Sequence, residues 1–192
     1  MINISVWASG NGSNAENLIQ YFENHADIRI DHILCNNAEA GVIERAQRLG
    51  TDCFVYSRKD FREGEIILNK LLERKTDVIV LSGFLQMVPV EIIKRFPAAI
   101  INIHPALLPD FGGKGMYGHH VHEAVIASGE RQSGITVHLV DEIYDHGEIL
   151  TQKYCPVLEN DTPEMLAARV HELEYEYFPL AVEQYIKVFR SL

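Results

Sequence analysis

The segment Ala99–Pro109, with the sequence AIINIHPALLP, decides the fold and carries the most informative polar residues of the chain. Its isoleucine-rich first half predicts a buried strand over Ala98–Ile103. Pro105 ends the strand, because a proline nitrogen donates no hydrogen bond. Since side chains two residues apart in a strand share a face, we expect Asn102 and His104 to lie side by side at its carboxyl end.

An amide beside an imidazole at a strand end fits acyl-transfer chemistry. The Asn102 amide can donate to an oxygen that gains negative charge, and the His104 imidazole can carry a proton near pH 7. The alternative is structural: Asn102 caps a turn and His104 is a hydrogen-bonded core histidine. A motif this short does not decide between them, so the rest of the chain must.

The rest of the chain alternates predicted strands with predicted helices. We expect strands at Ile2–Trp7, Ile28–Cys35, Cys53–Tyr56, Val78–Leu81 and Ser133–Val140, and helices from about Ala15, over Glu39–Leu49, over Phe61–Arg74 and from about Asp161. This order predicts an α/β fold: one domain spanning residues 1–192, with a mostly parallel, Rossmann-like sheet covered by helices on both faces. Ligands of such sheets bind outside the carboxyl ends of the strands.

Composition and charge narrow the class of protein. The 192 residues are 47% hydrophobic and 23% charged, as in an ordinary soluble globular protein. The net charge of −10 argues against a nucleic-acid partner, which would call for a basic face. No apolar run approaches the ~18 residues of a membrane span, and no targeting segment is recognisable. We therefore expect a cytoplasmic protein that neither binds a membrane nor uses its three separated cysteines in disulfides.

The glycine-rich segment Gly10–Asn14 lies between the first strand and the first helix. That layout aims free N–H groups of a helix N-terminus at an anion such as a phosphate. The segment also satisfies the loose dinucleotide fingerprint, but the second strand ends in Asn36-Asn37 instead of the acidic residue that would hold a ribose, which disfavours a nicotinamide or flavin enzyme. A third alternative is a tight turn without a ligand.

Three loops carry further candidate residues. The apolar loop Gly83–Val88 either covers the core or forms one wall of a pocket for a flat aromatic ligand. The loop Asp110–Gly118 has four glycines and is a candidate lid. A carboxylate of the acidic loop Asp141–Gly147, if it lies beside His104, would raise the pKa of that histidine; otherwise the loop is a solvated turn.

Three other candidates are interpreted as structural or carry no ligand. His119, His120 and His122 begin a helix, but no neighbouring cysteine or carboxylate completes a ligand set, so we expect no metal. His138, within a predicted strand, is interpreted as structural. Glu174 lies at the edge of the apolar stripe of the last helix, where a rim charge is the simplest interpretation.

Four separated motifs resemble those of the phosphoribosylglycinamide formyltransferase family, folate-dependent enzymes of purine biosynthesis. The motifs are Gly10–Asn14, Asn102-x-His104-Pro105 followed by Leu107-Leu108-Pro109, Asp145-x-Gly147, and Arg169-Val170 with Glu174. The resemblance implies transfer of the formyl group of 10-formyltetrahydrofolate to the amine of phosphoribosylglycinamide, without a metal. It further implies that Asn102 and a protonated His104 stabilise the oxyanion, and that Asp145 keeps His104 protonated.

The resemblance also assigns the binding residues. It gives phosphoribosylglycinamide to Gly12, Ser13, Asn14 and Glu174, and the folate cosubstrate to Arg62, Leu85, Gln86, Met87, Val88, Asn102, Val140 and Asp141. The partners expected are these two small molecules and, in a homodimer, a second copy of the chain.

Three rival functions remain. A methionyl-tRNA formyltransferase would need a basic surface, whereas this chain is acidic. A 10-formyltetrahydrofolate hydrolase, with water as the acceptor, is the main alternative. A nucleotide-binding module without catalysis would explain Gly10–Asn14 but would leave Asn102, His104 and Asp145 as coincidence.

Overall fold

The computed structural model describes residues 1–189, which form strands and helices in alternation. In chain order the elements are β1 (Ile2–Ala8), α1 (Ser13–Phe22), β2 (Ile28–Cys35), α2 (Gly41–Arg48), β3 (Asp52–Val55), α3 (Arg58–Glu63), α4 (Glu65–Glu73), β4 (Val78–Leu81), α5 (Val90–Arg95), β5 (Ile100–His104), α6 (His119–Ser128), β6 (Gln132–Leu139), β7 (Ile149–Pro156) and α7 (Pro163–Phe189). The strands follow the order β3-β2-β1-β4-β5-β6-β7 in the sheet. The predicted α/β fold is confirmed.

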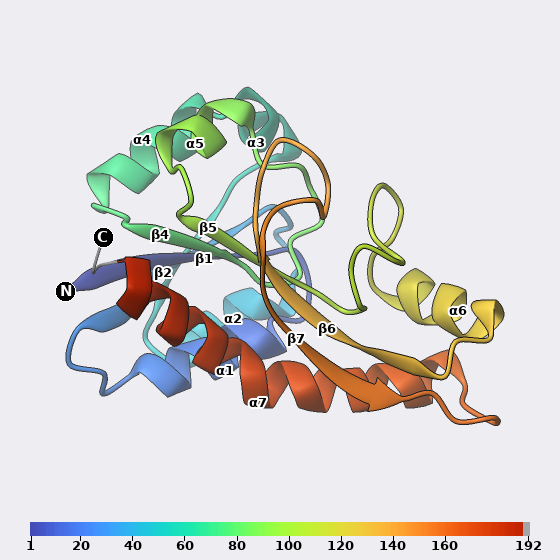
Figure 1. The fold of residues 1–192 in the computed structure, drawn as a ribbon. Coiled ribbons are helices and arrows are strands. Elements are labelled where there is room, and N and C mark those ends of the chain that lie inside the picture. Colours follow the sequence, from blue (N-terminus) through green and yellow to red (C-terminus); the bar gives the residue numbers. More distant parts are fainter. Residues whose placement is uncertain (190–192) are drawn as a thin grey trace. The chain divides into compact units, whose positions relative to one another are not determined.

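The chain divides into two compact units, Met1–Ile101 and the residues from Asn102 onward. In the first unit β1 pairs in parallel with β2 and β4, and β2 pairs in parallel with β3. Helices α1 and α2 cover one face of these strands, and α3, α4 and α5 cover the other (Figure 1). Burial from both sides explains why β4 is wholly apolar and why five of the seven residues of β1 are apolar.

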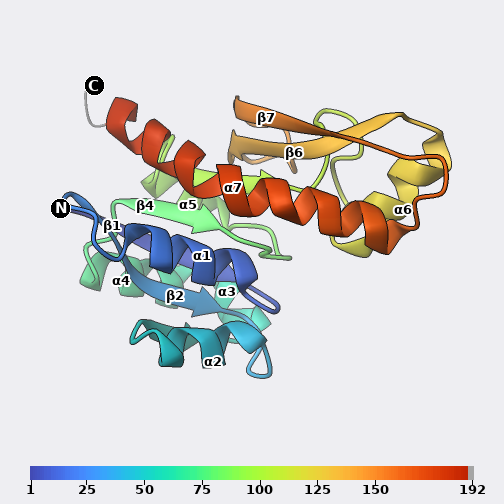
Figure 2. The ribbon, with the colours of Figure 1, turned by 90° about the horizontal axis from the view of Figure 1, so that it is seen from below.

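In the second unit β6 pairs with β7 in antiparallel orientation. The long helix α7 packs along both strands and also contacts α6 (Figure 2). The antiparallel β7 is why the sheet is mostly, and not wholly, parallel. Strand β5 leads into this unit, and its last residue is His104.

A cluster of aromatic rings fixes the loop after β4 in the first unit. Trp7 is fully buried, and its ring centroid lies 5.4 Å from that of Phe61 and 5.2 Å from that of Phe84. The hydroxyl of Ser9, at the end of β1, accepts from the Leu85 N–H at 2.9 Å. These contacts hold the Gly83–Val88 loop at the carboxyl end of β1.

One predicted helix is two helices in the structure. The prediction of a single helix over Phe61–Arg74 was wrong, because the helix is interrupted at Gly64, between α3 and α4. Gly64 has φ +77°, a left-handed conformation that glycine adopts without steric cost, and a Cβ there would lie 3.1 Å from Pro89 Cβ.

A buried carboxylate anchors the start of α7. Asp161 accepts from the Leu158 N–H at 2.8 Å and from Arg169 at 2.7 and 3.0 Å. Hydrogen bonds from Arg169 and from the Leu158 N–H lower the pKa of Asp161 from its ordinary 3.8 to about 2. The side chain of Thr162 then caps the helix by accepting from the Met165 N–H at 3.3 Å.

We predict that Asp161→Asn lowers the Tm at pH 7, because the variant loses a carboxylate that is bound more tightly in the folded chain than in the unfolded one. Because the pKa of Asp161 is lower in the folded chain, its ionised carboxylate stabilises the fold above pH 3.8. That stabilisation disappears as the pH falls from 3.8 to about 2. The Tm gap between wild type and variant should therefore narrow over that range. Calorimetry checks this, with the exposed Glu159→Gln as control; a gap that does not change with pH would contradict it.

Candidate functional site

The second unit brings Asn102, His104 and Asp145 into one cluster and adds His138. Asn102 Nδ2 lies 3.0 Å from His138 Nε2. One Asp145 oxygen lies 3.6 Å from His104 Nδ1, and the other lies 3.6 Å from His138 Nε2. The carboxylate therefore stands between two buried imidazoles.

Both ring nitrogens of His104 face hydrogen-bond acceptors. Nε2 donates to the Phe111 carbonyl oxygen at 2.8 Å, which places a proton on Nε2 because a carbonyl only accepts. Nδ1 faces the Asp145 carboxylate. These two neighbours favour the doubly protonated imidazolium.

The net pKa of His104 nevertheless lies below its ordinary 6.5. Burial of the ring lowers the pKa most, and the charge of Asp145 and the Phe111 carbonyl raise it by less. Asp145 raises the pKa of His104 in the expected direction, but the loss of water around a side chain that is only 4% exposed lowers this pKa by more.

The Asp110–Gly118 loop holds Asp145 in place. One of its oxygens accepts from the Gly113 N–H at 2.8 Å. Burial opposes ionisation, but the neighbouring histidines and this N–H outweigh it and keep the pKa of Asp145 below 3.8. Two residues later Gly147 approaches the Leu139 carbonyl so closely that a Cβ would lie 1.8 Å from its oxygen. The Asp145-x-Gly147 motif thus reflects one charge and one close backbone contact.

Glu174 belongs to the second unit as well. Its carboxylate lies 3.1 Å from His171 Nδ1, and this hydrogen bond raises the pKa of His171. His122 is buried, with its Nδ1 bonded to no other described group; burial lowers the pKa of His122, while the charge of Glu174 raises it by less. The charge of Glu174 also raises the pKa of His104, by less than the charge of Asp145 does.

Besides Asn102, two second-unit residues are assigned to folate, and both lie just after β6. Val140 and Asp141 are both half-buried. The Asp141 carboxylate accepts from the Ile143 N–H at 2.8 Å and pairs with His146 Nδ1 at 2.8 Å. The acidic loop is therefore ordered by its own side chains.

The first unit holds the glycine-rich segment at the start of α1. Gly12 caps the helix with φ +80°, and Glu16 N–H donates to its carbonyl at 2.9 Å. A Cβ on Gly12 would lie 2.5 Å from Val42 Cβ. Ser13 and Asn14 follow in the first turn, where helix N–H groups point outward without intrahelical acceptors. The backbone geometry of an anion site is present.

Basic side chains of α2 lie beside this segment. Arg45 Nε donates to the Asn11 carbonyl at 2.9 Å, and its guanidinium pairs with Glu16. Arg48 pairs with the same carboxylate at 2.7 Å. Glu16 has a lowered pKa: burial raises it, and the two arginines lower it by more.

The remaining first-unit residues are exposed or line the loop after β4. Leu85 and Met87 are about half exposed, at 52% and 50%, whereas Val88 is buried and Gln86 half-buried. Arg62 lies exposed in α3. The loop thus offers apolar surface, as a pocket wall would, in addition to the core contact of Phe84.

The histidines at the start of α6 form ion pairs. His119 and His120 are each 3.2 Å from a Glu123 oxygen. Among residues 1–189 no group of three His, Cys, Asp or Glu side chains is placed to hold a metal ion. Over the same range, no helix is both long and apolar enough to cross a membrane.

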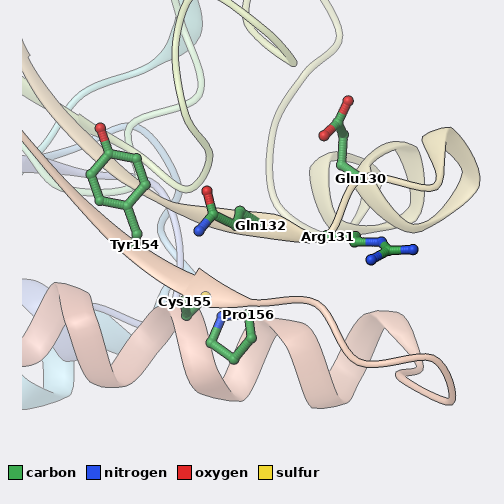
Figure 3. Close-up of a pocket in the computed structure, with 6 residues that line it drawn as sticks. All are labelled: Glu130, Arg131, Gln132, Tyr154, Cys155 and Pro156. Atoms are coloured by element: carbon green, nitrogen blue, oxygen red, sulfur yellow. The ribbon is translucent and has the colours of Figure 1, made fainter.

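Sequence reasoning missed two members of the cluster. His138 was interpreted as structural, and its partner Asn102 lies 36 residues away, so only the arrangement of β5 and β6 reveals the contact. The Phe111 carbonyl is a backbone group, on which sequence patterns give no signal. A separate surface hollow contains none of the predicted residues (Figure 3); its lining is Glu130, Arg131, Gln132, Tyr154, Cys155 and Pro156.

We predict that Gly12→Ala destabilises the fold by about 2 kcal/mol or more, because a left-handed residue acquires a Cβ that collides with Val42. The matched control is Gly10→Ala, whose Cβ would meet nothing within 4 Å. Urea unfolding of both variants measures the difference. Equal stability of the two would contradict the close approach of Gly12 to Val42.

We predict that His104 titrates below 6.5 in the wild type and lower still in Asp145→Asn. The variant removes the charge that opposes the effect of burial. NMR titration of the histidine ring protons measures both values. A wild-type pKa above 6.5, or one that rises on substitution, would contradict this balance between burial and charge.

Comparison with known proteins agrees with this geometry. Residues 2–182 match the family described as formyl transferase. A phosphoribosylglycinamide formyltransferase of Bacillus subtilis is 33% identical over 189 residues, covering 96% of this chain and 94% of the relative. The solved phosphoribosylglycinamide formyltransferase of Brucella melitensis is 37% identical, with a TM-score of 0.87 over 96% of this chain and 95% of that one.

The plant relatives are longer. A chloroplastic phosphoribosylglycinamide formyltransferase of Vigna unguiculata is 42% identical over 187 residues, which are 94% of this chain but 59% of the relative. The Arabidopsis thaliana relative is 38% identical, and the chain spans 66% of its length. The resemblance seen in the sequence motifs is thus confirmed across the chain, which belongs to the formyl transferase family.

Proposed function

We propose that the chain transfers the formyl group of 10-formyltetrahydrofolate to the amine of 5'-phosphoribosylglycinamide, giving N-formylglycinamide ribonucleotide and tetrahydrofolate. The observation that carries this proposal is the cluster of Asn102, His104 and Asp145 at the end of β5. In this cluster Asn102 is a neutral hydrogen-bond donor, His104 can carry a proton, and the charge of Asp145 raises the pKa of His104. Relatives named for this activity in Bacillus subtilis and Brucella melitensis support the choice of substrates.

In the proposed reaction the substrate amine attacks the formyl carbon. A new C–N bond forms, the bond from the formyl carbon to the folate nitrogen breaks, and a proton passes from the amine to that nitrogen. Negative charge develops on the formyl oxygen. The Asn102 N–H that is not bonded to His138 donates to this oxygen, and Asp145 favours the protonated form of His104, which adds positive charge nearby.

The Phe111 carbonyl, in the Asp110–Gly118 loop, limits the hydrogen bonds that His104 can donate to a substrate. The Nε2 proton of His104 is bonded to the Phe111 carbonyl. Direct donation from Nε2 to the reacting oxygen therefore requires the Asp110–Gly118 loop to withdraw that carbonyl. Asn102 needs no such movement, so in this arrangement it is the donor that is ready.

We assign the remaining predicted residues to the two substrates. Gly12, Ser13 and Asn14 bind the phosphate through outward-pointing N–H groups. Glu174 accepts from the ribose hydroxyls. The residues assigned to the folate are Arg62, Leu85, Gln86, Met87, Val88, Asn102, Val140 and Asp141; the exposed apolar faces of Leu85 and Met87 suit a flat ring.

Three further predictions complete the proposal. We treat residues 1–192 as one formyltransferase domain, in agreement with the family match over residues 2–182. A cytoplasmic location stays a prediction from the sequence, and the plant relatives are described as chloroplastic. The homodimer also stays a prediction.

We predict that Asn102→Ala lowers kcat by about 10² to 10³ without unfolding the chain, because one oxyanion donor is lost from a half-buried position. Steady-state assays of formyl transfer and a Tm measurement check both parts. The control is His120→Ala, which removes an exposed imidazole of the same unit. Near-wild-type turnover by Asn102→Ala would refute the proposed role.

The acceptor is tested by following loss of the formyl group with and without the ribonucleotide. With a transferase, 10-formyltetrahydrofolate loses its formyl group only when phosphoribosylglycinamide is present, and the product carries the formyl group on its amine. Equal rates with and without the ribonucleotide would instead establish the hydrolase.

A further inference from the structure

His138 contacts Asn102, the proposed oxyanion donor. We infer that its imidazole fixes which way the Asn102 amide points and so acts as a positioning residue. This inference rests on the formyl transfer proposed above. The side chain of His138 is 2% exposed, in β6, where the pairing with β7 shifts register between Val137 and His138. Such a bulge re-aims the side chains next to it.

The hydrogen bonds of His138 identify its tautomer. Nδ1 lies 2.7 Å from the carbonyl oxygen of Leu139, which only accepts, so Nδ1 carries a proton. In a neutral ring Nε2 is then an acceptor. Gly147 packs against the same Leu139 carbonyl, which keeps that oxygen in place.

The acceptor at Nε2 selects one orientation of the Asn102 amide. Asn102 Nδ2 lies 3.0 Å away and donates one of its two N–H groups to Nε2. The second N–H diverges from the first and is available to a substrate oxygen. In the opposite orientation the Asn102 carbonyl would face the Nε2 lone pair, and two acceptors in contact repel each other.

The orientation matters for catalysis because the two ends of an amide have opposite polarity. With the nitrogen held toward His138, a donor faces the formyl oxygen as negative charge develops there. With the amide turned, that oxygen would meet a carbonyl, which destabilises the transition state. His138 thus preorganises the Asn102 N–H that donates to the formyl oxygen.

Asp145 is the other group that faces Nε2, at 3.6 Å, which is longer than a hydrogen bond. A proton on Nε2 would point toward that carboxylate and would favour the Asn102 carbonyl over its NH₂. The inference therefore requires an unprotonated Nε2, which 15N NMR of the wild-type ring tests without any substitution. Protonated Nδ1 with bare Nε2 is the expected result, and a proton on Nε2 would overturn the inference.

Two substitutions separate positioning from packing. His138→Leu retains bulk but has no acceptor, whereas the side-chain oxygen of His138→Gln reaches roughly to the place of Nε2. We expect the leucine variant to lose about 10² or more in kcat, with KM for both substrates within about threefold, and the glutamine variant to recover to within about tenfold of wild type. Near-wild-type kcat in a folded leucine variant, or equal losses in both variants, would overturn the inference.

A double-mutant cycle identifies the residue through which His138 acts. If His138 only orients Asn102, then Asn102→Ala combined with His138→Leu loses no more kcat than Asn102→Ala alone. The inference would be overturned if His138→Leu lowered kcat further in the Asn102→Ala background but not in the Asp145→Asn background. That result would show that His138 acts through Asp145. Absence of formyl transfer by the wild type would refute the proposed function itself, an outcome distinct from failure of any variant.

Discussion

The cluster in the second unit depends on one carboxylate, Asp145, placed between two buried imidazoles. Each of its oxygens lies 3.6 Å from a ring nitrogen, one of His104 and one of His138. Removing water from this region makes every charge interaction stronger and every unpaired charge costlier. The two histidines and, by less, the Gly113 N–H at 2.8 Å lower the pKa of the carboxylate by more than burial raises it. The remaining groups arrange themselves around this charge.

The histidines respond to that environment in different ways. Burial lowers the pKa of His104 by more than the charge of Asp145 raises it, so this pKa lies below 6.5. A proton carrier poised in this way can accept a proton and release it again. His138 instead bonds a carbonyl through Nδ1 and an amide through Nε2. In the proposed mechanism His104 thus carries a proton, whereas His138 orients the Asn102 amide.

The sequence predicted those parts of the site that local patterns encode. Asn102 and His104 follow from the two-residue period of a strand that ends at Pro105, and Gly12 follows from a strand, turn and helix in succession. The family resemblance supplied Asp145 and Glu174. The break at Gly64 was missed because an apolar helical period runs through it, and a left-handed glycine does not interrupt that period. The contact of His138 with Asn102 depends on long-range strand arrangement. The sign of the His104 pKa shift depends on burial, which a list of neighbouring charges leaves out.

The proposed mechanism depends on a contact between the second N–H of Asn102 and the oxygen of the formyl group. A crystal structure of the chain with phosphoribosylglycinamide and an unreactive analogue of 10-formyltetrahydrofolate tests this contact most directly. We expect the analogue's carbonyl oxygen about 3 Å from Asn102 Nδ2, with the substrate amine on the far side of the formyl carbon and the contact of Asn102 with His138 intact. An analogue bound with its carbonyl away from Asn102, or an Asn102 amide turned with its oxygen toward His138, would contradict the proposed mechanism.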